Sequence, residues 1–195
     1  MKVAPEHVSN PVLDAMGKPH IDTYEAFVQQ FKRVGKKLPS QRYLVNYFIS
    51  AHPGSTLNDA LTLALYLIKR GMHPEQVQDF IPLPLTLSGA MYHTETNPVT
   101  GKRIYVAKTF RERKMQRALI QYRNPSNRQL IRDALKILKA QQLETLFLKV
   151  ATKRRQPPSG GNDGRRAGSS SPRSGKSAPR RINNAAKARQ TGKRR

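Results

Sequence analysis

The chain has 195 residues and a formal net charge of +24, and it contains no cysteine. Disulfides, thiolate zinc sites and cysteine-bound iron–sulfur clusters are therefore excluded within this chain. No apolar run is long enough to cross a membrane, and the N-terminus lacks the apolar core of a signal peptide. We therefore expect a cytoplasmic protein with no membrane partner.

The chain opens with a strand pattern followed by two helix patterns. Residues 2–4 predict the last residues of a strand. Asn10 is a typical N-cap residue and begins a short predicted helix that ends before Gly17. Asp22 opens a longer helix, with Glu25 three residues on as its capping-box partner. The apolar residues of this second helix recur at helical spacing, which predicts one buried face.

A second strand and helix follow, and then a third strand. Residues 42–49 are apolar on both faces, as expected for a strand of a covered parallel sheet. Thr56 and Asp59 predict a capped helix start, and Gly71 predicts its C-terminal end. Residues 76–82 predict another short strand. This alternation predicts βαβ units and an α/β fold with a parallel sheet.

The pattern changes in the second half of the chain. Residues 97–101 predict a turn and residues 103–107 an edge strand. Two basic amphipathic helices are predicted over 111–122 and 125–142. Residues 153–195 hold 14 Lys and Arg with a single Asp, a net charge of +13, and few apolar side chains. Such a segment cannot offset its ordering entropy, so we predict a disordered basic tail.

The predicted sheet has too few strands to close on itself. About three strands in sequence leave unpaired edges, whereas a closed (β/α)₈ barrel takes roughly 200 residues or more. The simplest interpretation is that the chain is the C-terminal piece of something larger. A truncated, split or wrongly started gene product would each explain it.

Three stretches of sequence then stand out together. They are "VAPEHVSNPVLDAMGKP", "YFISAHPGSTLNDALTLALYLIKRG" and "VQDFIPLPLTLSGAMYHT", in this order. The set resembles the second half of a radical S-adenosylmethionine (SAM) barrel, closest to the YgiQ-type family of radical SAM proteins. The resemblance covers roughly residues 2–140. It implies part of a (β/α) radical SAM barrel over 1–94, a helical extension over 95–150 and a disordered basic tail over 151–195.

The resemblance also implies a cofactor site at the C-terminal ends of the strands. The residues expected to form the shelf for S-adenosylmethionine are Glu6, Ser9, Ser50, His52, Gly54, Ser55 and Thr56. Asp79 and Tyr92 are assigned to the substrate side. The glycine turn would let the backbone approach a ligand closely, and the free N–H groups of the next helix would be available as donors.

The resemblance breaks at the metal cluster. Radical SAM chemistry needs a [4Fe-4S] cluster held by a CxxxCxxC motif, which lies upstream in the family, and this chain has no cysteine. The chain alone is therefore not expected to hold the cluster or to generate a 5′-deoxyadenosyl radical. An N-terminal half of the barrel would be the required partner.

Structural interpretations of the same residues stay open. Glu6 could only cap the helix that follows it, and Ser55 and Thr56 are first of all a helix start. His7 and His52 are conceivable as a metal pair, but no third ligand is evident, so we expect packing or hydrogen bonding and no metal site.

A different class of function rests on charge. The two predicted basic helices carry Arg111, Arg113, Lys114, Arg117, Arg128, Arg132, Lys136 and Lys139. With the tail, they favour a non-enzymatic RNA- or ribosome-associated protein, because Lys- and Arg-rich segments bind phosphates with little specificity. A non-functional remnant is the third alternative, since exposed sheet edges predict poor solubility.

Overall fold

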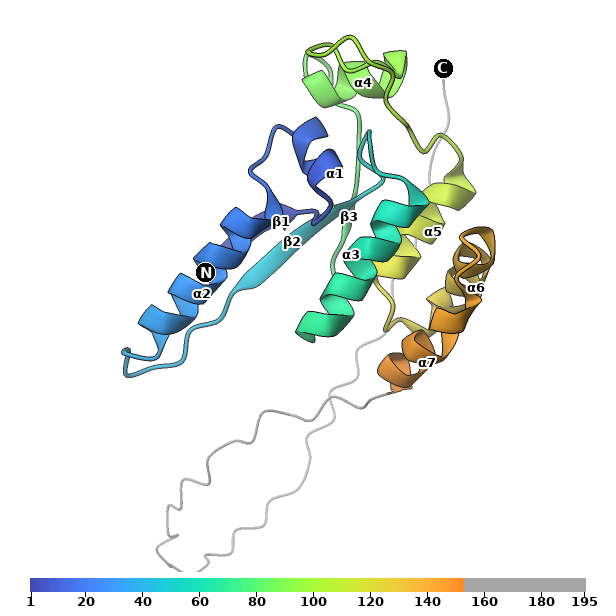
Figure 1. Ribbon diagram of the computed structural model, residues 1–195. Helices are drawn as coiled ribbons and strands as arrows, with labels where there is room; N and C mark the ends of the chain where they lie inside the picture. The colour runs from blue at the N-terminus through green and yellow to red at the C-terminus, as the bar shows by residue number, and fades with distance from the viewer. Residues whose placement is uncertain (153–195) are drawn as a thin grey trace, which may run out of the picture. The chain divides into compact units, whose positions relative to one another are not determined.

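Three parallel strands pair in the order in which they occur along the chain (Figure 1). They are β1 Lys2–Glu6, β2 Val45–Ser50 and β3 Gln78–Asp79. The computed structural model describes residues 1–152. The predicted α/β class and parallel sheet are confirmed, and over these residues the sheet is open and not closed into a barrel.

The register of the strands places their carboxyl ends at one edge. Glu6 lies opposite Phe48 and Ser50 lies opposite Asp79, with an irregularity in β1 between Val3 and Glu6. β3 is only two residues long, so the strand predicted over 76–82 was too long. Its short ladder reflects the prolines that follow, because Pro82 and Pro84 have no N–H to donate.

Two helices connect β1 to β2, and both begin earlier than predicted. They are α1 Asn10–Ala15 and α2 Ile21–Gly35. Ser9, not Asn10, is the N-cap of α1, and His20, not Asp22, is the N-cap of α2. The predicted Asp22–Glu25 capping box is therefore wrong. The Glu25 carboxylate instead accepts a hydrogen bond from the Tyr66 hydroxyl.

The third helix, α3 Leu57–Arg70, begins and ends as predicted. Thr56 accepts a hydrogen bond from the backbone N–H of Asp59, and the Asp59 side chain accepts from the backbone N–H of Thr56. Gly71 closes the helix with φ +65°, in the left-handed region that glycine enters at little cost.

The second half of the chain contains more helix than predicted. Its elements are α4 Leu87–Thr94, α5 Phe110–Ile120, the 3₁₀ turn η1 Pro125–Asn127, α6 Arg128–Ile137, η2 Gln141–Leu143 and α7 Glu144–Thr152. Neither α4 nor α7 was predicted. The predicted edge strand over 103–107 is reduced to one antiparallel bridge between Thr96 and Arg103.

The single helix predicted over 125–142 is helical only as far as Ile137, as η1 and α6, and there the chain leaves the helical path. Lys139 takes φ +53°, and the backbone N–H of Ala140 donates to the carbonyl of Leu135 at 2.8 Å. This pairing is a Schellman-type helix end. The sequence hides it because lysine, and not glycine, occupies the left-handed position.

One core joins the sheet to the helices of the second half. α5 lies between α3 and α6 (Figure 1), and Leu63, Leu67, Leu119 and Leu135 are fully buried at these contacts. All of the described residues belong to one compact unit. By contrast, α2 buries none of its residues, and its apolar face is only half covered.

Two further predictions concern membrane spans and the C-terminal tail. No helix within residues 1–152 is both long and apolar enough to cross a membrane. Ala151 and Thr152, the first two residues of the tail predicted over 151–195, belong to α7, and the rest of that tail lies outside the described residues.

Candidate ligand site at the strand ends

The carboxyl ends of the three strands surround a cavity of about 260 Å³. Glu6, at the end of β1, and Asp79, at the end of β3, line it together with His52, which follows β2. The remaining lining residues are Met16, Ile49, Gln78, Phe80, Ile81, Leu83, Thr86 and Ser88. This strand-end cavity is where ligands bind in parallel α/β folds, because each strand delivers a loop to the same edge.

Two residues at this edge hold strained backbone conformations. Glu6 ends β1 with φ +62°, and Ala51 follows β2 with φ +57°. For residues with a Cβ atom the left-handed region costs of order 1–3 kcal/mol, and such residues persist where the surroundings impose them. Lys18 supports Glu6 through an ion pair at 3.2 Å. The strain therefore coincides with the edge that forms the cavity.

His52 is buried and held in one tautomer. Its Nδ1 lies 2.7 Å from the carbonyl oxygen of Pro53, which can only accept, so Nδ1 carries the proton. Nε2 then accepts a hydrogen bond from the Ser88 hydroxyl at 2.8 Å. Burial lowers the pKa of His52, against the smaller opposing effect of the Pro53 carbonyl. The imidazole is consequently neutral near pH 7, and it packs edge-on against Phe80.

Both carboxylate oxygens of Asp79 accept a hydrogen bond from a neighbouring side chain. The Ser50 hydroxyl donates to one carboxylate oxygen, and the Arg117 guanidinium donates to the other at 2.9 Å. Ser50 therefore acts on the cavity through Asp79. Arg113, one turn earlier on α5, donates to the carbonyl of Phe80 at 2.7 Å. The end of β3 is thus tied to α5 by two arginines.

The turn between β2 and α3 is stabilised by hydrogen bonds to later segments of the chain. Ser55 donates its hydroxyl proton to Gln116 at 3.1 Å, and the backbone N–H of Gly54 donates to the Tyr105 carbonyl at 2.7 Å. Gly54 has φ +92°, and a side chain there would lie 3.1 Å from Ala15. The close approach that this glycine allows is therefore to α1.

Ser9 and Thr56 meet at one carboxylate. Ser9 donates to Oδ1 of Asp59 and Thr56 donates to Oδ2, each at 2.6 Å. Partial burial raises the pKa of Asp59, but these hydrogen bonds outweigh it and the pKa is lowered overall. The contact joins the start of α1 to the start of α3. Neither Ser9 nor Thr56 lines the strand-end cavity.

Tyr92 lies outside that lining as well. Its ring packs against Phe80, with centroids 5.9 Å apart, and the Lys108 ammonium lies 4.4 Å from its centroid. Of the residues expected at the site, the structure therefore brings Glu6, His52 and Asp79 to one cavity. Ser9, Ser50, Gly54, Ser55 and Thr56 do not line this cavity, and their roles toward a ligand stay predictions.

His7 is a polar residue whose environment the sequence could not reveal. It is 1% exposed, and its Nδ1 accepts a hydrogen bond from the backbone N–H of Ser9 at 3.0 Å. Its Nε2 has no partner within residues 1–152. Burial lowers the pKa of His7 to about 4, Asp59 opposes this and His52 adds to it. Over the same residues no three His, Cys, Asp or Glu side chains gather as metal ligands.

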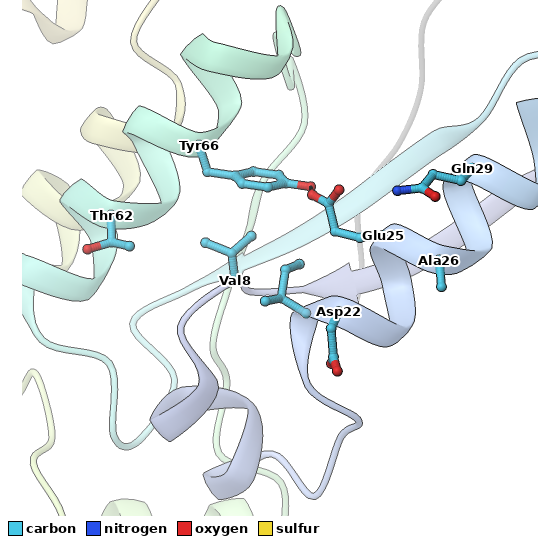
Figure 2. Close-up of a pocket in the computed structure, with 8 residues that line it drawn as sticks. Val8, Asp22, Glu25, Ala26, Gln29, Thr62 and Tyr66 are labelled. Atoms are coloured by element: carbon cyan, nitrogen blue, oxygen red, sulfur yellow. Dashed lines mark hydrogen bonds between the residues drawn. The ribbon is translucent and has the colours of Figure 1, made fainter.

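A larger hollow of about 560 Å³ lies between α2 and α3 (Figure 2). The Tyr66 hydroxyl and the Glu25 carboxylate point toward each other across it, and they are joined by a hydrogen bond of 2.6 Å. Arg70 forms an ion pair with the same carboxylate. This network links two helices and reaches no strand end, so its contacts are structural.

Half of the basic residues of the two helices form hydrogen bonds or ion pairs with other parts of the protein. Arg113 and Arg117 hold the end of β3, Arg111 pairs with Asp133, and Arg132 pairs with Glu144. Four of the eight basic residues of the phosphate-binding signal therefore have hydrogen-bond or ion-pair partners, and a fifth, Lys114, lies over the ring of Phe110. The prediction that RNA contacts these helices remains untested.

The fold is that of an α/β protein with a cavity at the carboxyl ends of its parallel strands. Residues 75–195 match the family model described as a domain of unknown function, DUF3362. Since this match covers more than half of the chain, the protein belongs to that family. The matched region includes α5, which holds the end of β3.

The chain has relatives that are considerably longer proteins. A UPF0313 protein of Methanocella arvoryzae is 53% identical over 135 residues, which are 69% of this chain and 22% of that protein. UPF0313 proteins of Methanosarcina mazei and Clostridium botulinum are 48% and 47% identical over the same lengths, covering 22% and 21% of those proteins. The chain thus spans about a fifth of its curated relatives. No solved structure matches it significantly.

Proposed function

We propose that the chain forms part of the S-adenosylmethionine site of a YgiQ-type radical SAM enzyme and is not catalytic alone. The observation that carries the proposal is the strand-end cavity. Glu6, His52 and Asp79 come from three consecutive strand ends and line one hollow. The ordered sequence resemblance assigns the same edge to the cofactor.

The residues of the cavity fit S-adenosylmethionine but not the iron–sulfur cluster. Carboxylates suit the sulfonium charge and the ribose and amino groups of the cofactor, and the neutral His52 suits a flat aromatic base. The cofactor would supply the adenosyl group for radical chemistry. The cluster needs thiolates that this chain lacks, so no step through it is assigned to these residues.

The partner in this proposal is the remainder of the barrel. β1 uses only one edge within the described sheet, and α2 leaves its apolar face half covered. In this proposal, a preceding strand of the barrel would pair with the free edge of β1. Since the relatives are several times longer, the covering segment would belong to the same polypeptide or to a separately made half.

The test is a chimera of the Methanocella arvoryzae relative in which its homologous segment is replaced by residues of this chain. Produced without oxygen, it should bind iron and S-adenosylmethionine and release 5′-deoxyadenosine on reduction. Glu6→Gln should weaken binding of S-adenosylmethionine by about tenfold or more, because it removes a charged acceptor. Equilibrium dialysis with labelled cofactor measures this.

The matched control is Glu95→Gln. Glu95 also pairs with cations, Arg103 and Lys108, but it does not line the cavity. Equal losses for both variants would contradict the assigned site. A chimera that loads iron but binds no S-adenosylmethionine would overturn the proposed function itself.

Binding of nucleic acid is the second candidate, and it is favoured by the net charge of +13 over residues 153–195. The full chain should bind structured RNA more tightly than heparin at moderate salt, and deletion of residues 153–195 should abolish the difference. Equal binding to RNA and to heparin would show non-specific binding to polyanions and would contradict this second candidate function.

A further inference from the structure

One face of α5 reaches the two loops that form the strand-end cavity. Arg113, Gln116 and Arg117 lie three and four residues apart, so they share a face of the helix. We propose that α5 is the element that sets the shape of the cavity and that Gln116 is its positioning residue for His52. This inference deepens the proposed function and rests on it for the identity of the ligand.

Gln116 is completely buried, and both ends of its amide are used. Its oxygen accepts from the backbone N–H of Ala51 at 3.2 Å and from the Ser55 hydroxyl at 3.1 Å. Its nitrogen donates to the Ser55 carbonyl at 2.9 Å. A glutamine can satisfy this set because its planar amide offers an acceptor and donors together. The side chain therefore spans the turn from 51 to 55.

The bond to Ala51 falls at the strained position. Ala51 has φ +57°, a conformation that persists only where other contacts impose it. Because Ala51 directly precedes His52, this backbone conformation sets the direction in which the imidazole leaves the chain. His52 then reaches Pro53 and Ser88. Gln116 thus acts on the cavity through the backbone and not by contact with a ligand.

The arginines fix the opposite wall from the same helix. Arg117 holds the carboxylate of Asp79, and Arg113 holds the carbonyl of Phe80. The separation of His52 from Asp79 is therefore set by the spacing of side chains along α5. A helix from the DUF3362 region, rather than the sheet alone, determines the geometry of the cavity.

The test uses the full 195-residue chain with Gln116→Met, which keeps the length of the side chain and removes its hydrogen bonds. We expect the amides of Ala51, His52, Gly54 and Ser55 to exchange at least about tenfold faster, while those at the centre of α3 keep their relative protection. The imidazole ¹⁵N shifts of His52 should move away from those of a single fixed tautomer. Ser55→Ala, a milder change, should shift the same signals in the same direction.

Two controls separate positioning from general destabilisation. Leu119→Ala weakens the core on the same helix, and it should accelerate exchange through global unfolding without moving the ¹⁵N shifts of His52. Gln129→Met makes the same substitution on the exposed side of α6 and should change neither signal. Unaltered His52 signals in both Gln116→Met and Ser55→Ala would overturn the inference.

The chimera adds a readout that depends on the ligand. There, Gln116→Met should weaken binding of S-adenosylmethionine by about tenfold, and Gln129→Met should not. If the parent chimera binds no cofactor, the proposed function is wrong. The ¹⁵N shifts of His52 in the 195-residue chain still test the role of α5. If the parent binds and Gln116→Met binds equally well, the positioning role fails alone.

Discussion

At the scale of residues, Asp59 joins two helix starts through its two carboxylate oxygens. Ser9 donates to one oxygen and Thr56 to the other, so the first turn of α3 is tied to the residue that precedes α1. The same carboxylate closes the capping box of α3. A local sequence signal and a contact fifty positions apart in the chain thus share one side chain.

Thr56→Ala should lower the free energy of unfolding by about 1 kcal/mol, because it removes the N-cap acceptor of α3. Urea denaturation followed by circular dichroism measures the change. Thr62→Ala is the control, since Thr62 lies exposed within the same helix. It should leave stability unchanged or slightly raised, because alanine is the better helix former. Equal losses would contradict the capping role.

His7 should make the stability of the protein depend on pH. Its pKa in the folded state is about 4 against an ordinary value of 6.5, so between these values the unfolded chain binds more protons. The free energy of unfolding is therefore fully retained above pH 6.5 and falls by about 3 kcal/mol as the pH drops toward 4. Urea titrations at several pH values measure the slope.

His7→Gln should flatten that slope, since glutamine does not titrate. Part of the slope should remain, because burial also lowers the pKa of His52. His93→Gln is the matched control, because His93 is exposed on α4. An unchanged slope in His7→Gln would show that the buried imidazole does not control acid stability.

At the scale of elements, the helix ends differ in how they stop. Gly71 ends α3 in the left-handed region of backbone conformation. Lys139 enters the same region after α6, where its Cβ atom makes the conformation sterically unfavourable. The pattern of the sequence shows the first end and conceals the second. Thr86 and Thr109 likewise cap the starts of α4 and α5, and of these two helices only α5 was predicted.

Gly71→Ala should destabilise the protein by about 1 kcal/mol, because φ +65° is unfavourable for a residue with a Cβ atom. Gly35→Ala is the control. Gly35 ends α2, a Cβ there would meet nothing within 4 Å, and its φ is not in the left-handed region. It should be neutral or stabilising, because alanine restricts the unfolded chain. Thermal melts of the two variants test the contrast.

At the scale of the whole molecule, the sheet and the second-half helices share their core. α5 packs on α3 and on α6, and it also contacts β2. Leu119, which is completely buried on α5, belongs to that common cluster. Residues of the cavity and residues of the helical extension should therefore unfold together.

Leu119→Ala should lower the free energy of unfolding by about 2–5 kcal/mol, the usual range for a large buried aliphatic side chain. Amide exchange in β2 should accelerate along with exchange in α6, because both depend on one core. Leu83→Ala, at an exposed position, should cost little. If α6 loosened while β2 kept its protection, the single cooperative core would be contradicted.

The sequence alone determined the alternation of strands and helices in the first half. Thr56 with Asp59 and the glycine at 71 specify α3 because caps and left-handed glycines act through neighbours in the chain. The lack of cysteine likewise excluded a thiolate-bound cluster within this chain before any fold was known. The assignment of Glu6, His52 and Asp79 to one site rests instead on the family resemblance, because local patterns do not show which strand ends lie together.

Only the tertiary structure decided what surrounds those residues. The burial of His7, the meeting of Ser9 with Thr56, and the contact of Gln116 with the turn after β2 join segments that are distant along the chain. Periodicity and capping describe neighbours within a few residues, so they carry no information on such pairs. The walls of the cavity come from packing of α5 against the sheet, which is a property of the folded chain.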